Sequence, residues 1–248
     1  MTAEKVAIVA GSGNGIGAAT AVALAKRGLT IVAADIDGDA AERVAAQIRD
    51  SGGKAYPAAL DVSDEGAVQK LVSKVIRENA RVDVLANSAG IAGPGGKPSH
   101  ELSAADFRKT LAVNLFGTIH LTNGVMPHMI EAGYGRIVHV ASIAGKEGNP
   151  NMAPYNTSKA GMIGFVKGVA KEVARHGVTV NAVAPAVIRS QMNDAVPDDT
   201  LRYMLARIPI GRLGEPEEVA ELIAFITSPG CSFTTGFVFD ASGGRATY

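Results

Sequence analysis

The sequence predicts an α/β protein built on a doubly wound, parallel, seven-stranded sheet. Short apolar runs alternate six times with longer amphipathic stretches, and a last apolar run closes the pattern. The apolar runs are nearly continuous, which is typical of strands buried on both faces. No linker, repeat or low-complexity segment divides the chain, so we expect a single Rossmann-type domain over residues 1–248.

Periodicity and turn residues place the individual elements. The expected strands cover 5–10, 30–35, 54–62, 81–90, 135–142, 178–185 and 236–242. The expected helices cover 15–28, 39–52, 63–79, 103–132, 153–177 and 215–228. The least regular segment, about 185–214, is rich in Pro and Met. Because loops at the carboxyl ends of parallel strands form the ligand crevice, this segment is a candidate lid.

Composition excludes several classes of function. Twenty-four basic residues balance twenty-four acidic ones, so no global field favours nucleic acid or an anionic membrane surface. No apolar run approaches the roughly 18 residues of a membrane helix. The five histidines never fall at metal-ligand spacing, and the single Cys231 cannot form an internal disulfide. We expect a cytoplasmic protein with no metal, nucleic-acid or membrane partner.

A glycine-rich loop, AGSGNGIG at 10–17, lies between the first expected strand and helix. Gly11 permits a tight turn, while Gly15 and Gly17 let a pyrophosphate approach the backbone and the helix pack on the sheet. Amides at the helix N-terminus would then face the phosphates. Many glycine turns bind nothing, but this position between strand and helix favours a dinucleotide site.

Asp35 ends the second expected strand, about 20 residues after the loop. Its carboxylate can accept hydrogen bonds from the adenosine ribose and would repel a 2′-phosphate. Asp35 could instead cap the next helix, and the two roles can coexist. Neither Asn14 in the loop nor Ile36 and Asp37 after the strand offers a cation to a phosphate. The predicted cofactor is therefore NAD.

Four polar residues form the candidate catalytic group. Tyr155 and Lys159, in YNTSK, are four residues apart and share one helix face. Ser142 closes the fifth expected strand at the edge where the crevice opens, and Asn114 lies in the preceding long helix. Taken singly, these could be a solvated helix face, a cap and a satisfied core amide. Beside a dinucleotide loop, they indicate proton transfer coupled to hydride transfer.

The chemistry explains why a lysine accompanies the tyrosine. A free tyrosine titrates near pH 10, and lowering its pKa by about three units requires about 4 kcal/mol. A lysine charge about 4 Å away supplies about 1 kcal/mol in water and about 4 kcal/mol in a partly desolvated cleft. We therefore expect Lys159, with an oxidised nicotinamide, to lower the pKa of Tyr155. Ser142 would bond the reacting oxygen.

These motifs resemble the short-chain dehydrogenase/reductase family along essentially the whole chain. The loop resembles the family's TGxxxGxG, with Ala10 at the Thr position. NSAG at 87–90 resembles NNAG, with Ser88 in place of the second Asn. APAVIRS at 184–190 resembles PGxIxT, with Ala186 replacing the Gly. The group Asn114, Ser142, Tyr155 and Lys159 resembles the family's catalytic tetrad.

The resemblance implies further roles. Asp61 and Val62 would flank the adenine, and Ile188 and Ser190 would bind the nicotinamide carboxamide. Lys159 would also bind a ribose, while Asn114 would hold a helix distortion and a water. The predicted cofactor-binding residues are Gly11, Asn14, Gly15, Ile16, Gly17, Asp35, Asp61, Val62, Asn87, Gly90, Tyr155, Lys159, Ile188 and Ser190.

The motifs predict a small-molecule alcohol or ketone substrate without naming it. Beyond Ser142, the candidate substrate residues Lys146, Asn149 and Arg189 would suit a hydroxylated or carboxylated compound, although Lys146 and Arg189 could simply be solvated. The segments GKEGNPN and SGGRATY look like those of NAD-dependent sugar-acid or polyol dehydrogenases.

Two other functions stay open on the sequence. One is a carbonyl reductase like the 3-oxoacyl-acyl-carrier-protein reductases, which normally use NADPH and a basic dock for the carrier. The other is a non-catalytic NAD-binding regulator, against which the intact tetrad argues. The resemblance also implies a homotetramer, formed through 103–132, 153–177 and the last strand.

Overall fold

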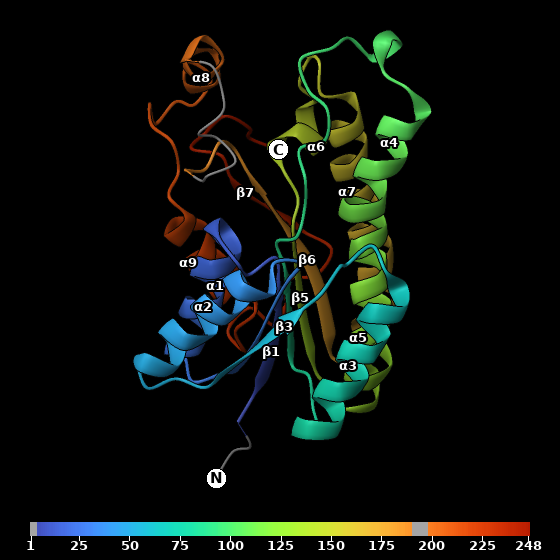
Figure 1. The fold of residues 1–248 in the computed structure, drawn as a ribbon, viewed down its shortest axis with the longest axis vertical. Coiled ribbons are helices and arrows are strands. Elements are labelled where there is room, and N and C mark those ends of the chain that lie inside the picture. The colour runs from blue at the N-terminus through green and yellow to red at the C-terminus, as the bar shows by residue number, and fades with distance from the viewer. Residues whose placement is uncertain (1–3, 190–197) are drawn as a thin grey trace.

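The expected sheet is present in the computed structural model, which describes residues 4–189 and 198–248. Seven parallel strands follow the order β3-β2-β1-β4-β5-β6-β7, which confirms the predicted fold class (Figure 1). The strands are Val6–Ala10 (β1), Thr30–Asp35 (β2), Ala55–Ala59 (β3), Val84–Asn87 (β4), Gly135–Val140 (β5), Val178–Pro185 (β6) and Val238–Ala241 (β7).

The central strands are buried on both faces, and the two edge strands are not. Every residue of β1, β4, β5 and β6 is buried, whereas Ala55 is the one buried residue of β3 and β7 has none. Tyr56 on β3 is 55% exposed. Edge strands have a neighbour on one side only, so the continuous apolar runs of the sequence mark the middle of the sheet.

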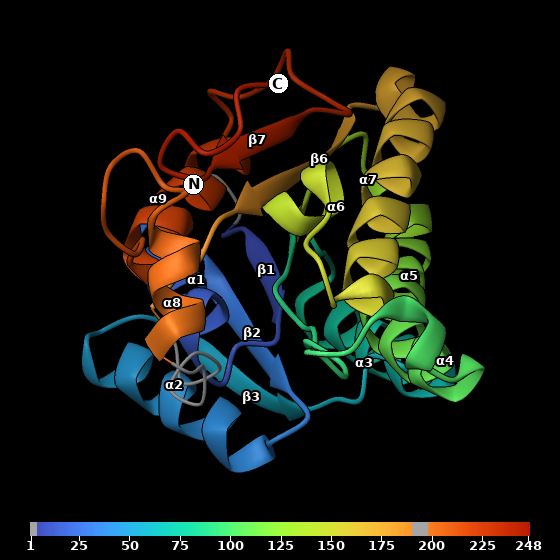
Figure 2. The same ribbon diagram turned by 90° about the horizontal axis from the view of Figure 1, so that it is seen from above.

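Helices cover both faces of the sheet in two layers (Figure 2). Residues of β1 alternate between them: Ile8 packs in the apolar cluster with α3, α5 and α7, and Val9 in the cluster with α1, α2 and α9. The helices are Gly15–Lys26 (α1), Gly38–Asp50 (α2), Glu65–Asn79 (α3), Ala104–Leu111 (α4), Gly117–Glu131 (α5), Ile143–Glu147 (α6), Ala153–Val173 (α7), Asp198–Leu205 (α8) and Pro216–Ile226 (α9), with short 3-10 turns at Ser99–Glu101 and Ala174–His176.

The expected continuous helix over 103–132 is interrupted. Between α4 and α5 the chain forms one π-helical turn, Ala112–Phe116, which contains the buried Asn114. Such turns insert an extra residue and re-aim the side chains around it, and they occur frequently at functional sites. Helix periodicity does not reveal them, because both neighbouring segments are helical.

Two short helices were not expected from the sequence. Helix α6 follows β5 directly, with Ser142 as its N-cap, and α8 lies within the segment 185–214. Both lie at the carboxyl end of the sheet, where α6 packs beside α7 (Figure 1). Within the described part of the chain, no helix is long and apolar enough to cross a membrane.

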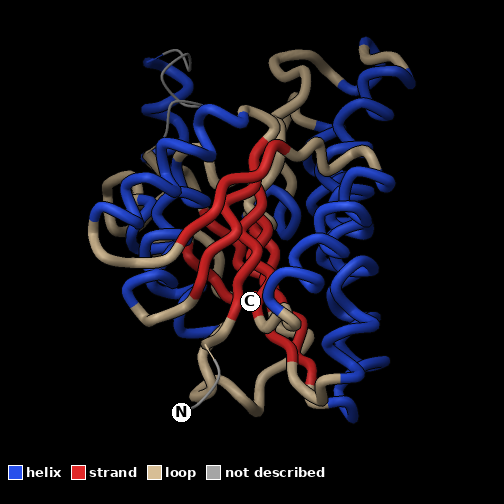
Figure 3. Tube along the Cα trace, turned by 60° about the horizontal axis from the view of Figure 1, so that its bottom comes forward, coloured by secondary structure: helices blue, strands red, loops and turns tan. Residues whose placement is uncertain are grey.

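The strand order reverses between β1 and β4. From β1 the chain winds outward through β2 and β3, then returns to the opposite side of β1 as β4 and continues to β7. Figure 3 shows the strands lying between the two helical layers. Loops leaving β1 and β4 diverge to opposite faces at this reversal, which opens a crevice at the carboxyl ends of the strands.

Candidate active site

A cavity of about 770 Å³ opens at this crevice. Most of the predicted site residues line it, from the glycine loop at one end to the Ser142 region at the other. The predicted residues in its lining are Gly11, Asn14, Gly15, Ile16, Asp35, Asp61, Val62, Gly90, Ser142, Asn149, Tyr155, Lys159 and Ile188. Those outside the lining are Gly17, Asn87, Asn114, Lys146 and Arg189. Ser190 lies outside the described residues.

The glycine loop has the geometry that a dinucleotide needs. Gly11 has a φ of +73°, and a Cβ there would lie 2.5 Å from the amide nitrogen of Ala89. A Cβ on Gly17 would lie 1.8 Å from the carbonyl oxygen of Gly11, so the loop closes tightly on the start of α1. The Asn14 side chain makes no capping bond, which leaves the first amides of α1 open to the cavity. These residues fit a pyrophosphate.

Asp35 is fixed in position but keeps hydrogen-bonding capacity. Its Oδ2 accepts a 2.8 Å bond from the Gly13 amide, and its Oδ1 a 3.0 Å bond from the Asp37 amide. A carboxylate can accept about four bonds, so it retains room for ribose hydroxyls. The N-cap of α2 is Asp37, whose Oδ1 accepts from Asp39 and Ala40. The alternative reading of Asp35 as that helix's cap is therefore wrong.

The residues predicted around the adenine and after β4 differ in role. Asp61 accepts bonds from the amide and hydroxyl of Ser63, which lower its pKa. Asn87 is buried below the cavity, where its Oδ1 accepts from the Ala89 amide at 3.0 Å and its Nδ2 donates to Thr118 at 3.1 Å. Asn87 therefore shapes the turn after β4, which places Gly90 in the cavity wall.

Asn114 joins three elements from the π-helical turn. Its Oδ1 accepts from the Ile91 amide at 2.8 Å, and its Nδ2 donates to the Ile91 carbonyl and to Ser158 Oγ, each at 2.9 Å. The side chain is fully buried and satisfied on both ends. Asn114 thus locks the loop after β4 to α7, the helix that carries Tyr155 and Lys159.

Ser142, Tyr155 and Lys159 converge from β5 and α7. The Ser142 Oγ accepts a 3.1 Å bond from the Ala144 amide at the start of α6, which leaves its proton to donate. Lys159 Nζ donates a 2.7 Å bond to the carbonyl of Val140 and lies 5.7 Å from the centroid of the Tyr155 ring. All three residues line the cavity.

Burial governs the protonation of this group in the protein alone. Burial raises the pKa of Tyr155, and hydrogen bonding with Ser142 opposes that change. Burial lowers the pKa of Lys159 to about 8. The expected lowering of the Tyr155 pKa is therefore not found, because burial is the largest influence on that pKa and the Ser142 hydrogen bond offsets only part of it. Within the described residues, no cluster of His, Cys, Asp or Glu could hold a metal.

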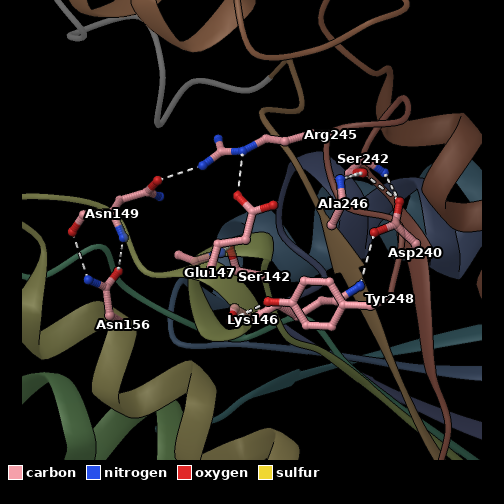
Figure 4. Close-up of polar contacts among 11 residues, drawn as sticks. Ser142, Lys146, Glu147, Asn149, Asn156, Asp240, Ser242, Arg245, Ala246 and Tyr248 are labelled. Atoms are coloured by element: carbon pink, nitrogen blue, oxygen red, sulfur yellow. Dashed lines mark hydrogen bonds and ion pairs between the residues drawn. The ribbon is translucent and has the colours of Figure 1, made fainter.

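The predicted substrate residues separate into two groups. Asn149 lines the cavity. Its backbone amide donates to Oδ1 of Asn156, and its carbonyl accepts from Nδ2 of the same side chain. Lys146 turns away, to Asp240 at 3.2 Å and to the ring of Tyr248 (Figure 4). Arg189, with a side chain 68% exposed, pairs with Glu215 at 3.0 Å. The structure therefore favours the solvated reading for Arg189 and a structural role for Lys146.

Sequence reasoning missed a charged residue of the cavity wall, Arg245. It follows two glycines after the last strand, and its guanidinium contacts Glu147 and Asn149 (Figure 4). The available signal was SGGR, since adjacent glycines permit a sharp reversal of the chain. Its distance in sequence from the other motifs hid the connection.

The sheet order, the glycine cradle and the Ser, Tyr and Lys group define a dinucleotide-binding protein of the oxidoreductase class. A family model described as enoyl-(acyl carrier protein) reductase matches residues 10–246. The chain belongs to the short-chain dehydrogenase/reductase family, as the sequence motifs predicted.

Individual relatives match over nearly their whole length. The 2-dehydro-3-deoxy-L-rhamnonate dehydrogenase (NAD+) of a Sphingomonas species is 42% identical over 246 residues, covering 99% of this chain and 97% of that protein. The 3-oxoacyl-acyl-carrier-protein reductase of Thermotoga maritima is 38% identical, covering 97% of each chain. The crystal structure of the protein gox2181 has a TM-score of 0.93 at 31% identity, covering 98% of this chain and 95% of that chain.

Proposed function

We propose that this chain is an NAD-dependent dehydrogenase that interconverts a secondary alcohol and a ketone on a small, polar hydroxy acid. The observation that carries the proposal is that one cavity joins the glycine cradle to Ser142, Tyr155 and Lys159. When bound, the nicotinamide accepts or returns the hydride and, oxidised, adds a positive charge. The protein's own residues hold the reacting carbon and move the proton.

Each catalytic residue has one task in this scheme. The Tyr155 hydroxyl takes the proton from the alcohol during oxidation and returns one to the ketone oxygen during reduction. Ser142, whose oxygen is already held by the Ala144 amide, donates its proton to the reacting oxygen. Protonated Lys159 favours the phenolate form of Tyr155 and offers Nζ protons to a ribose hydroxyl. Asn114 positions the helix that carries both groups.

The cavity supports a preference for NAD over NADP. Asp35 and Ile36 line the adenosine end, and Asp37 follows them at the start of α2. Among the described residues that line the cavity, the cations are Lys159 and Arg245, both on segments that meet near Ser142. A 2′-phosphate would thus meet a carboxylate without a compensating cation. The relative from Sphingomonas carries NAD+ in its name.

The proposed substrate class rests on relatives and on the polar end of the cavity. One relative is named for a sugar acid, and another, from Sinomonas cyclohexanicum, is named cis-4-hydroxycyclohexanecarboxylate dehydrogenase and is 41% identical over 242 residues. Asn149 and Arg245 bring an amide and a cation to this end. Reductase activity on 3-oxoacyl thioesters is the second candidate, because several relatives carry that name.

A spectrophotometric screen tests both candidates. Purified protein is assayed at 340 nm with NAD(H) and NADP(H) against sugar acids, cyclic hydroxy acids, polyols and 3-oxoacyl thioesters. We expect NAD-linked oxidation of hydroxy acids to exceed the other activities. Faster turnover of 3-oxoacyl thioesters with NADPH would replace the proposal with the second candidate.

One substitution separates an enzyme from a non-catalytic NAD-binding regulator. In Tyr155→Phe the ring stays and the proton-carrying oxygen is lost. Turnover should fall by about 10²–10⁴-fold, the usual contribution of general acid–base catalysis, while NADH binding measured by fluorescence is retained. Unchanged cofactor-dependent turnover would rule out Tyr155 as the proton carrier.

Three further predictions concern the protein's surroundings. We propose that it is cytoplasmic and works as a homotetramer, in which Phe116 and Phe233, both exposed large apolar residues, are covered by neighbouring copies. Light scattering gives the mass in solution, and a monomer would contradict this. The third prediction is that segment 185–214 acts as a lid. It includes residues outside the described ranges, and its support is that Met204 of α8 lines the cavity.

A further inference from the structure

The residues after β7 fold back onto α6 through a built turn. Asp240 Oδ1 accepts bonds from the amide of Ser242 at 2.9 Å and from its hydroxyl at 2.5 Å. The Ser242 Oγ in turn accepts from the Ala246 amide at 3.0 Å. Gly243 and Gly244 between them have φ values of +64° and +86°, which side chains with a Cβ rarely adopt. The turn therefore has one defined shape.

This turn delivers Arg245 to the cavity wall. Its Nε donates to Glu147 at 3.1 Å and its Nη2 to Asn149 Oδ1 at 2.7 Å, both on the segment after Ser142 (Figure 4). The side chain is only 5% exposed. Tyr248 adds a 2.7 Å bond from its hydroxyl to the Lys146 carbonyl, which ties the chain down beyond Arg245.

The Arg245 guanidinium has N–H donors that no described protein group accepts. A guanidinium has five N–H donors, and the two bonds to Glu147 and Asn149 hold the Nε side of the fork. Among the described residues no hydrogen bond involves Nη1, and Figure 4 shows this nitrogen pointing away from both partners. Arg245 Nη1 is not among the buried side-chain atoms that lack a partner, and Arg245 lines the cavity, so these donors are accessible to a ligand there.

The cavity narrows the choice of ligand. Lys159 gives one proton to the Val140 carbonyl and is already assigned to Tyr155 and a ribose hydroxyl, so Arg245 is the remaining cation among the described lining residues. Its planar fork matches a carboxylate in two parallel hydrogen bonds. Asp35, which marks the adenosine end, lies on β2 and not near the α6 segment.

We infer that Arg245 binds the carboxylate of the substrate, and that Glu147 and Asn149 are positioning residues which aim it. The inference rests on the proposed dehydrogenase function and adds to it a specificity-determining residue. It assigns the substrate two recognition points: a hydroxyl or ketone at Ser142 and Tyr155, and a carboxylate at Arg245. Neutral polyols and thioesters lack the second point.

The test compares matched substrates and matched variants. For the best hydroxy acid of the screen, the acid and its neutral primary amide are assayed with Arg245→Gln, Arg245→Lys and Glu147→Gln. In Arg245→Gln the KM for the acid should rise about 30-fold, the value of a charge-assisted pair, while kcat and the KM for the amide change less than about threefold. Arg245→Lys should recover part of the loss.

The Glu147→Gln variant distinguishes two roles for Arg245: binding the substrate carboxylate, and only holding the residues after β7 against α6. If Arg245 only tied the chain end to α6, removing either partner would impair acid and amide equally, and that result would overturn the inference. With Arg245 as the carboxylate ligand, Glu147→Gln should lower the KM for the acid, because the amide oxygen still accepts from Nε and the negative charge that competes with the substrate is gone. NADH fluorescence checks that all three variants keep the cofactor site.

The same inference stays testable if the proposed function fails. Should the wild type oxidise no alcohol with either cofactor, calorimetry with pyruvate, a simple 2-oxo acid, probes the cavity in the NADH-loaded protein. Pyruvate binding that is lost in Arg245→Gln but kept in Glu147→Gln supports the carboxylate site. No binding, or equal binding in all variants, contradicts it.

Discussion

The ammonium group of Lys159 is held by the carbonyl of Val140, at 2.7 Å, and no carboxylate among the described residues lies within ion-pair distance of it. Strand β5 therefore anchors the lysine, while α7 carries it. The arrangement fixes the distance to the Tyr155 ring and leaves the lysine charge uncompensated. Burial of this charge lowers the pKa of Lys159, so holding the ammonium here costs stability.

Lys159→Met should reveal this cost as a dependence of stability on pH. The pKa of Lys159 falls from 10.5 to about 8 on folding, so the folded protein releases this proton first. Below pH 8 the buried ammonium costs of the order of 3 kcal/mol, and the cost disappears as pH rises from 8 to 10.5. The variant's advantage in urea denaturation should thus be largest at pH 7 and shrink toward pH 10. Lys171→Met, an exposed position on the same helix, is the control and should show no such trend.

Ser142→Ala should move the pH profile of alcohol oxidation upward. Hydrogen bonding with Ser142 lowers the Tyr155 pKa against the effect of burial, so its removal raises that pKa further. Oxidation needs the deprotonated tyrosine, and the rising limb of kcat/KM should therefore shift to higher pH. Activity at pH 7 should fall about 100-fold, as for loss of one oxyanion donor. Ser142→Thr retains the hydroxyl and should restore both; a downward shift in the alanine variant would contradict the assignment.

Asp35→Asn should relax the choice between the two cofactors. A carboxylate about 5 Å from a phosphate charge repels it by about 3 kcal/mol at an effective dielectric constant of 20. The amide keeps one oxygen for the Gly13 amide and loses the exposed bond from the Asp37 amide, so the loop should persist. We expect the ratio of kcat/KM for NADP to that for NAD to rise about 10- to 100-fold. Asp37→Asn removes the same charge two residues away, retains the α2 cap and should leave the ratio unchanged.

Gly17→Ala should abolish cofactor binding. The added Cβ would lie 1.8 Å from the Gly11 carbonyl oxygen, so the loop or the start of α1 would have to move. Isothermal titration with NADH should show at least a 100-fold loss of affinity, about 3 kcal/mol. Gly230→Ala is the control, because its Cβ would lie at an ordinary 3.5 Å from Ser228 Oγ. Native affinity in Gly17→Ala would show that the loop does not hold the pyrophosphate.

The sequence predicted the fold closely because strand and helix periods dominate an α/β chain. Strands β1 to β7 fall inside the predicted runs, and the glycine loop, Ser142 and Tyr155 line one cavity as their places at strand ends indicated. What sequence could not supply was the π-helical turn at Asn114, since both flanking segments have the same period. Electrostatics were also beyond it: the direction of the Tyr155 pKa depends on burial.

The direction of long polar side chains was a second feature that the sequence could not predict. Lys146 and Arg189 stand close in sequence to Ser142 and to the nicotinamide motif, but one turns to Asp240 and the other to Glu215. Arg245 is about 100 residues from Ser142 in the chain and lies in the same cavity. A short distance along the chain therefore did not predict contact with the cavity for residues with long polar side chains, because such side chains can reach several different partners.

The Gly243–Gly244 turn separates selectivity from the rest of the molecule. The described residues that we assign to cofactor binding and proton transfer precede residue 190, on the strands, the helices and the loops between them, whereas Arg245 follows the last strand of the sheet. On the proposed role of Arg245, substitutions at residues 243–248 would change which acid is accepted and leave the glycine loop, Ser142, Tyr155 and Lys159 in place.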